Sequence, residues 1–151
     1  MKKDNIRDYA TEAFRYYAAC GMKTSEELKQ QVKERIYEQS KREVIRSGSG
    51  SYSDSTAYAV MEAEKKVEDL KAEILDIIAV EKTMKQLTPE QKKAVEIVYF
   101  TDAGKGLDKG DISERVHKAE IEIPASSMSI YRWLRSARYI FSKERGLRII
   151  K

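Results

Sequence analysis

The sequence predicts an all-α fold, and three properties of the chain support this prediction. Apolar residues recur at intervals of three and four over most of its length, which is the spacing of one face of an α-helix. Charged residues make up 36% and apolar residues 41% of the chain, with seven glycines and two prolines, as is typical of amphipathic helices with solvated outer faces. No segment has the alternating pattern of a convincing strand. The 151 residues suit one ordinary domain or two small helical ones.

The first 46 residues are expected to form an N-terminal helical region. Its first helix covers Asn5–Ala19 and is followed by Gly21, a residue type that commonly ends helices. Its second helix begins at the capping box Thr24-Ser-Glu-Glu27, in which the threonine and glutamate side chains bond each other's backbone N–H groups. This helix is strongly charged and is expected to continue to about Arg46.

Residues 47–54 are rich in Gly and Ser and are expected to form a flexible linker, because such residues bury little and lose much entropy on ordering. Residues 55–87 are expected to form one long connecting helix with a heptad seam of apolar side chains. The seam consists of Val60, Ala63, Val67, Leu70, Ile74, Ile77 and Met84. It either packs against the chain's own first two helices or joins two copies in a homodimer, and the sequence leaves both alternatives open.

Residues 88–151 are expected to form a helix-turn-helix domain. A capping box followed by proline begins a buried helix over Thr88–Thr101. A glycine-containing loop then leads to a short helix over residues 111–120. The next connection, Ile121–Ser126, is expected to be a turn longer than is usual for this motif. The last helix is expected over residues 127–144.

This last helix has an apolar face and a polar face, and Ser127 is expected to cap it. The apolar face carries Ile130, Trp133, Leu134, Ala137, Ile140 and Phe141. A helix divided in this way can pack its apolar side on the two preceding helices and place its first turns in a DNA major groove. The side chains expected to contact base edges are Ser129, Tyr131, Arg132 and Arg135. Those expected to contact phosphates are Ser127, Arg138 and Lys143.

The charge distribution also favours a nucleic-acid partner. From Ser126 to Lys151 there are seven basic residues and one acidic residue, a net charge of +6, whereas the whole chain carries +4. The rest of the chain is therefore mildly acidic, and the basic C-terminal end is suited to a polyanion such as double-stranded DNA.

Other classes of protein are not expected from this sequence. It has no apolar run long enough for a membrane span and no secretory leader, so a cytoplasmic location is expected. A single cysteine, Cys20, and a single histidine, His117, exclude an internal disulfide and a plausible zinc site. The glycine-rich loop over residues 103–110 lacks the order of a phosphate-binding loop. We expect no catalytic constellation, no cofactor and no metal.

A resemblance to a known family is carried by three segments. They are Leu87-Thr-Pro-Glu-Gln-Lys-Lys-Ala-Val-Glu-Ile-Val-Tyr-Phe100, Asp111-Ile-Ser-Glu-Arg-Val116 and Ser127-Met-Ser-Ile-Tyr-Arg-Trp-Leu-Arg-Ser-Ala-Arg138. Together they resemble region 4 of bacterial sigma-70 factors, which contacts the −35 promoter element through a helix of the type Ser-x-Ser/Thr-x-x-Arg-x-x-x-x-Ala-Arg. The positions that match this pattern are Ser127, Ser129, Arg132, Ala137 and Arg138. No upstream segment resembles the promoter −10 binding region of a complete sigma factor.

The small size, the charged N-terminal helices and the sigma-like C-terminus together resemble phage late-gene regulators of the RinA/ArpU type. The resemblance implies a transcriptional activator of phage or prophage origin that works with RNA polymerase. Two alternatives remain at this point. One is a DNA-packaging protein such as a small terminase subunit, which also joins a helix-turn-helix to an oligomerising helix. The other is an adaptor that binds RNA polymerase without binding DNA.

Overall fold

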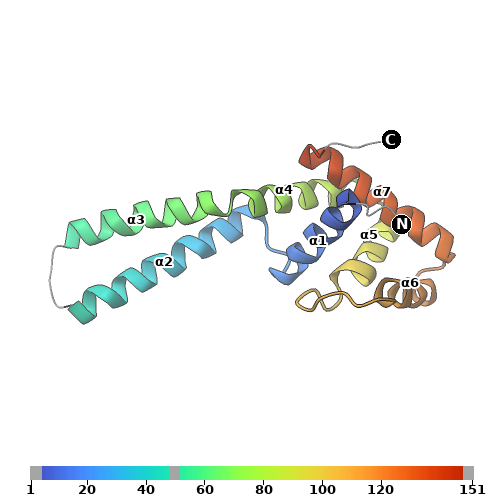
Figure 1. The fold of residues 1–151 in the computed structure, drawn as a ribbon, viewed down its shortest axis with the longest axis horizontal. Helices are drawn as coiled ribbons and strands as arrows, with labels where there is room; N and C mark the ends of the chain where they lie inside the picture. Colours follow the sequence, from blue (N-terminus) through green and yellow to red (C-terminus); the bar gives the residue numbers. More distant parts are fainter. Residues whose placement is uncertain (1–4, 48–51, 148–151) are drawn as a thin grey trace. The chain divides into compact units, whose positions relative to one another are not determined.

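The computed structural model describes residues 5–47 and 52–147, and all regular structure in these two ranges is helical (Figure 1). The all-α prediction is therefore confirmed. The elements are α1 (Asn5–Ala19), α2 (Ser25–Ser47), α3 (Tyr52–Asp69), α4 (Lys71–Gln86), α5 (Pro89–Val95), the π-helical turn η1 (Glu96–Phe100), α6 (Asp111–Glu122) and α7 (Ser127–Arg145). None of these helices is both long enough and apolar enough to cross a membrane.

The chain divides into two compact units, and the division differs from the expected one. A hairpin unit comprises residues 24–75, and a core unit comprises residues 1–23 together with residues 76–151. The expected N-terminal region, residues 1–46, is thus split: α1 belongs to the core unit and α2 to the hairpin unit. Sequence patterns detect each helix separately, but they carry no information on which helices pack together.

The expected long helix over residues 55–87 is wrong in detail, because two helices occupy it. Helix α3 ends at Asp69 and α4 begins at Lys71, with Leu70 between them. The backbone N–H of Leu70 bonds both the Lys66 and Val67 carbonyls at 3.2 Å, so the hydrogen-bond pattern tightens where the helix is interrupted. The boundary between the two units also falls within this stretch, at residues 75 and 76.

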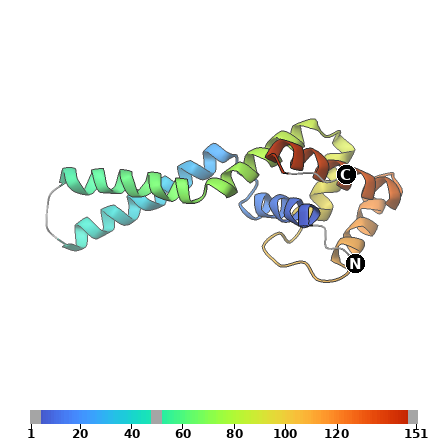
Figure 2. The same cartoon turned by 45° about the horizontal axis from the view of Figure 1, so that its top comes forward.

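In the hairpin unit, α2 and α3 lie side by side, as both cartoon views show (Figures 1 and 2). The expected capping box at the start of α2 is present: the Glu27 backbone N–H donates to Thr24 Oγ1 at 3.2 Å, and the Thr24 N–H donates to Glu27 Oε2 at 3.3 Å. Buried Ala59 and Ala63 lie one helical turn apart on α3. Of the expected linker, residues 47–54, the four residues 48–51 lie outside the described structure, and the residues on either side are helical.

Most side chains of the heptad seam are buried or half-buried within the single chain. Ala63, Ile74 and Ile77 are buried, and three further seam residues, Val67, Leu70 and Met84, are half-buried. Val60 is the seam residue that remains exposed. The burial favours the alternative in which the seam packs inside one chain, so this seam offers little surface through which residues 60–84 would join two copies.

The core unit contains aromatic rings from α1, η1 and α7 that pack against one another. The ring of Phe14 in α1 lies 5.6 Å from that of Tyr99 in η1 and 5.6 Å from that of Phe141 in α7. Apolar side chains of α4, α5 and α6, among them Val80 and Val95, complete the same buried cluster. Helix α1 therefore supplies part of the interior on which α7 rests.

A polar junction joins three helices of the core unit at the edge of this cluster. The Asp76 carboxylate in α4 accepts a hydrogen bond from the Tyr9 hydroxyl of α1 at 2.7 Å and one from Nε of Arg145 in α7 at 2.8 Å. Both bonds reach the same carboxylate oxygen, Oδ1. The junction fixes the C-terminal end of α7 relative to α1 and α4.

Candidate nucleic-acid interface

Helix α7 begins with a serine cap, one residue earlier than expected. Ser126 has the extended backbone of an N-cap, with φ −77° and ψ 160°, and its Oγ accepts a hydrogen bond from the Ser129 backbone N–H at 3.2 Å. Ser127, the expected cap, is instead the first helical residue. At the other end, Gly146 has a φ of +79°, which a glycine adopts without strain. Both ends of the helix are therefore fixed by local sequence.

The inner face of α7 is held in the core, as its apolar pattern predicts. Ile130, Leu134, Ala137 and Phe141 are buried, and Trp133 is half-buried against them. These side chains pack on the same buried cluster as residues of α5 and α6. The buried inner face holds α7 in place, and its outer face remains in solvent.

The turn between α6 and α7 is shorter than the sequence suggests. Helix α6 continues to Glu122, and the turn consists of residues 123–126, so the expected long connection from Ile121 to Ser126 is wrong. Ile123 is buried, which draws the end of α6 against the core, and its carbonyl accepts a bond from the Ala125 N–H at 2.7 Å. A turn of three to four residues is also the length that joins the two helices of a helix-turn-helix.

The outer face of α7 carries an exposed stripe, which we call the α7 stripe and which comprises Met128, Tyr131, Arg132, Arg135 and Tyr139. Successive members are three or four positions apart, except that Tyr131 and Arg132 are neighbours, so they share one side of the helix. Met128 is 74% and Tyr131 45% exposed. Three members are predicted site residues. Met128 and Tyr139 were missing from the predicted site, although the same spacing would have included them.

The other predicted site residues are placed less uniformly. Ser127 and Ser129 are half-buried in the first turn, and the Ser129 hydroxyl lies 3.2 Å from that of Ser126. Lys143 is exposed, but it follows Ser129 by fourteen positions and so lies about 21 Å farther along the helix axis. Arg138 is half-buried and donates from Nη1 to the Tyr99 hydroxyl at 2.6 Å, so part of its guanidinium group is committed to the scaffold.

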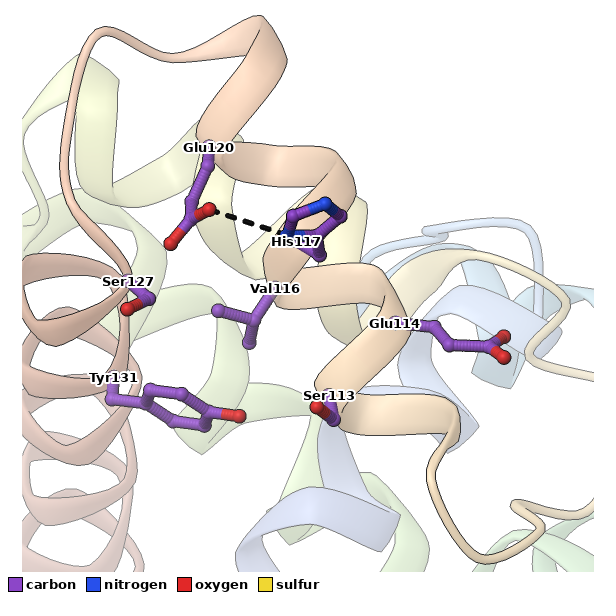
Figure 3. Close-up of a pocket in the computed structure, with 7 residues that line it drawn as sticks. All are labelled: Ser113, Glu114, Val116, His117, Glu120, Ser127 and Tyr131. Carbon is purple, nitrogen blue, oxygen red and sulfur yellow. Dashed lines mark ion pairs between the residues drawn. The ribbon is translucent and has the colours of Figure 1, made fainter.

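A cleft of about 550 Å³ lies between α6 and the start of α7 (Figure 3). Its lining is Ser113, Glu114, Val116, His117, Glu120, Ser127 and Tyr131. Figure 3 shows Ser113 and the Tyr131 hydroxyl facing each other across the opening. Nδ1 of His117 lies 3.4 Å from Oε2 of Glu120, one turn along α6. Both carboxylates of the lining, Glu114 and Glu120, belong to α6, so that side of the cleft is poorly suited to a phosphate, whereas Ser127 and Tyr131 line the side formed by α7.

The loop before α6 is held in place by two arginines. Arg15 of α1, only 3% exposed, donates to the backbone carbonyls of Tyr99, Thr101, Asp102 and Lys105. Arg115 of α6 donates to the Val98 carbonyl at 3.0 Å. Burial, and next the positive charge of Arg115, lower the pKa of Arg15 below its usual value. These contacts satisfy the carbonyl groups left unpaired where η1 ends.

Arg15 has a structural role that the sequence did not predict, since an arginine on a helical stripe is ordinarily a surface residue.

The structure also contains no group of three or more His, Cys, Asp or Glu side chains able to hold a metal ion within the described residues. Comparison of the chain with protein-family models, with curated proteins and with solved structures finds no match.

Proposed function

We propose that this protein binds double-stranded DNA in a sequence-specific manner and regulates transcription, and that the α7 stripe enters the major groove. The observation that carries the proposal is the exposure of Tyr131, Arg132 and Arg135 on a helix whose opposite face is buried and whose start follows a four-residue turn. This is the arrangement by which helix-turn-helix proteins present a helix to base edges.

The proposed roles follow from the position of each side chain. Arg132 and Arg135 are exposed in the first half of α7, where a guanidinium group reaches guanine and bonds it twice. Tyr131 and Met128 offer apolar contact to a thymine methyl. Ser129 contacts a base through its hydroxyl, and Ser127, with the free N–H groups of the first turn, contacts a phosphate.

Arg138 and Lys143 have weaker support as phosphate contacts. The bond from Arg138 to Tyr99 leaves its other guanidinium nitrogens for a phosphate, in a fixed orientation. Lys143 meets DNA only if the duplex follows α7 over much of its length. The carboxylates of Glu114 and Glu120 beside the cleft keep the DNA backbone away from α6 and restrict how the duplex approaches.

The resemblance to region 4 of sigma factors supports a role in transcription and contact with RNA polymerase. The similarity to RinA/ArpU-type regulators supports a phage or prophage late-gene activator that acts in the cytoplasm. We propose no catalytic activity and no cofactor for the chain. The turn of residues 123–126 has the length that helix-turn-helix motifs use, but it lacks the glycine that is common in such turns.

The test is selection of duplexes from a random library by the full-length protein, followed by binding titrations at several salt concentrations. We expect one enriched sequence and an affinity that falls steeply with salt, as counterions released from phosphates are made up from solution. Recovery of no sequence, with no duplex binding even at low salt, would contradict the proposal. RNA polymerase pull-down in that case would favour the adaptor, and a ring-shaped assembly would favour the packaging protein.

A substitution of Arg132 distinguishes base contact from phosphate contact. Arg132→Ala should weaken binding to the selected duplex by about 1–3 kcal/mol and change random-duplex binding much less, because a bidentate base contact is lost. The matched control is Arg35→Ala, since Arg35 is exposed on α2 in the hairpin unit. Equal loss on both duplexes would assign Arg132 to a phosphate instead.

A further inference from the structure

A second exposed stripe lies on α3 of the hairpin unit, and we call it the α3 stripe. Its members are Tyr58, Glu62, Lys65 and Asp69, at intervals of four, three and four residues, so they share one face of the helix. All four are exposed, whereas Ala59 and Ala63, buried in the hairpin, lie on another side of α3. The stripe is separate from the heptad seam predicted from the sequence.

The α3 stripe borders a groove in the hairpin unit. Ile36 and Gln39 of α2 line it together with the stripe, Met61 and Lys66, and its volume is about 630 Å³. Tyr58 is 68% and Met61 70% exposed, so two large side chains lie in water beside a half-buried isoleucine. Tyr58 and Met61 thus offer apolar surface beside the groove for a partner to cover.

The charges of the α3 stripe complement those of a second copy of the stripe that runs in the opposite direction. The order along the chain is tyrosine, glutamate, lysine, aspartate. Within the described residues Glu62 and Lys65 form no ion pair, with each other or with a neighbour. When two such helices lie antiparallel, Glu62 of each helix lies opposite Lys65 of the other.

We propose that two copies of this chain pair through their α3 stripes, antiparallel, about a two-fold axis that passes between residues 63 and 64. Glu62 of each copy then lies opposite Lys65 of the other, and the Tyr58 hydroxyl lies opposite the Asp69 carboxylate. Met61 lies opposite the aliphatic stem of Lys66. Every contact occurs twice, as a two-fold interface requires.

The same charges argue against a parallel arrangement. Parallel helices would place Glu62 opposite Glu62 and Lys65 opposite Lys65, and like charges facing each other are destabilising. A partner of a different kind would need a matching alternation of charge, whereas a second copy supplies it without any further assumption. The surface is therefore assigned to a second copy of the chain.

The interface is small, so the dimer is expected to be weak. Helix α3 has 18 residues and is about 27 Å long. One pair of such helices with a groove edge buries an area at the low end for specific complexes, the range of weak and transient associations. The association does not depend on DNA, so its failure and the failure of the proposed function are distinguishable.

The first test is sedimentation of the full-length chain, without DNA, over a wide range of concentrations. We expect a monomer–dimer equilibrium in which Glu62→Lys weakens the dimer by about tenfold or more, because two attractive pairs become repulsive at once. The control is Glu64→Lys, the same charge reversal at an exposed position off the stripe, which should leave the equilibrium unchanged. A monomer at every concentration, a larger assembly, or equal effects of the two variants would overturn the proposal.

Charge exchange between chains provides the complementary test. Chains with Glu62→Lys and chains with Lys65→Glu should each dissociate alone and should form a one-to-one dimer when mixed. Helical circular dichroism of each variant checks that the fold is retained, which is expected because both side chains are exposed. Failure of the mixture to associate would overturn the proposed pairing.

Helix direction is tested by disulfide formation in a Cys20→Ser background, which removes the chain's own cysteine. Chains with Tyr58→Cys should crosslink to chains with Asp69→Cys, and neither should crosslink to itself. Like positions lie about 16 Å apart in the antiparallel arrangement, because they are eleven residues from each other along the helix axis. Self-crosslinking at position 58 would overturn the antiparallel arrangement.

Discussion

At the scale of single residues, Arg15 supports the candidate interface although it lies outside it. Arg15 bonds four carbonyl groups around the end of η1, and these carbonyls lie in the segment that leads into α6. A guanidinium group is suited to this position because its planar array of N–H groups meets several acceptors at once. Its charge also lies at a helix C-terminus, where the helix dipole favours a cation.

Arg15→Ala should destabilise the folded protein by at least about 2 kcal/mol, since one hydrogen bond to a charged donor contributes about 1.5–3 kcal/mol and several are lost. Urea denaturation measures the change. Arg7→Ala is the control, because Arg7 is exposed on the same helix and its ion pair with Asp8 is solvated. Similar losses for both variants would mean that the carbonyl contacts of Arg15 do not stabilise the fold.

Tyr9 gives a pH-dependent contribution whose sign follows from its surroundings. Burial, and next the hydrogen bond to the Asp76 carboxylate, raise the pKa of Tyr9 above its usual 10.0. The folded state therefore holds the phenol proton more tightly than the unfolded state does. The resulting stabilisation is complete below pH 10 and is lost as the pH rises through the raised pKa.

Tyr9→Phe should lower the free energy of unfolding by about 1 kcal/mol at neutral pH, a modest value because Tyr9 is partly exposed. The difference from the unchanged protein should then narrow as the pH rises above 10. Lysine titration changes the free energy of unfolding of both proteins equally, so the difference between them at each pH does not contain it. Tyr139→Phe, at an exposed tyrosine of α7, serves as control. A difference that stayed constant or widened with pH would contradict the assigned direction.

At the scale of elements, α7 and its turn show how a local signal sets the geometry of the candidate site. The Ser126 hydroxyl accepts from the Ser129 N–H and fixes where the helix starts, hence which side chains occupy its first turn. Because α6 reaches Glu122 and Ile123 is buried, the start of α7 is also fixed relative to α6. One residue of difference in the start changes which side chains and unpaired N–H groups lie in the first turn, whereas the outer face is set by the buried positions Ile130, Leu134 and Phe141.

Ser126→Ala should destabilise the core unit by about 1 kcal/mol, the usual effect of losing a serine cap. Ser127→Ala is the matched control. Its hydroxyl caps nothing, so stability should be nearly unchanged, while duplex binding should weaken if Ser127 contacts a phosphate. Thermal denaturation and duplex titration of both variants separate the two roles. A larger loss of stability in Ser127→Ala would show that the cap is assigned to the wrong serine.

At the scale of the whole molecule, the chain's two ends belong to one unit. Residues 1–23 pack with residues 76–151, and the hairpin unit is inserted between them. Ala10, Ala13 and Phe14 of α1 lie in the same buried cluster as Phe141 of α7. The candidate DNA-binding helix therefore depends on a segment more than a hundred residues earlier in the chain.

A fragment of residues 88–151, the domain expected from the sequence, should not fold stably by itself. Without α1, the aromatic rings of Tyr99 and Phe141 lose their contacts with Phe14, and replacing a single buried phenylalanine with alanine already costs about 3–5 kcal/mol. Circular dichroism of the fragment, with the full chain as reference, measures this. A fragment with a cooperative unfolding transition like that of the full chain would contradict the role given to α1.

Most helices, the capping boxes at Thr24 and Thr88 and the two faces of α7 could be predicted from the sequence, because each depends on residues close together in the chain. The cap of α7 was predicted one residue too late, and residues 55–87 were predicted as one helix instead of two. The 3.6-residue periodicity identified Ile130, Leu134 and Phe141 as buried and Arg132 as exposed. The same periodicity contained Met128, which the predicted site omitted. These properties need only local backbone geometry and the preference of apolar side chains for the interior.

Only the tertiary structure decided which helices share a core. The assignment of α1 to the core unit, the burial of Arg15 and the closure of the heptad seam within one chain depend on contacts between distant segments. A hydrophobic pattern indicates that one face of a helix must be buried. It does not indicate which element covers that face, because the hydrophobic effect has no direction. Pairing of helices follows from the shapes and charges that meet in three dimensions, and for that reason the α3 stripe became recognisable only in the structure.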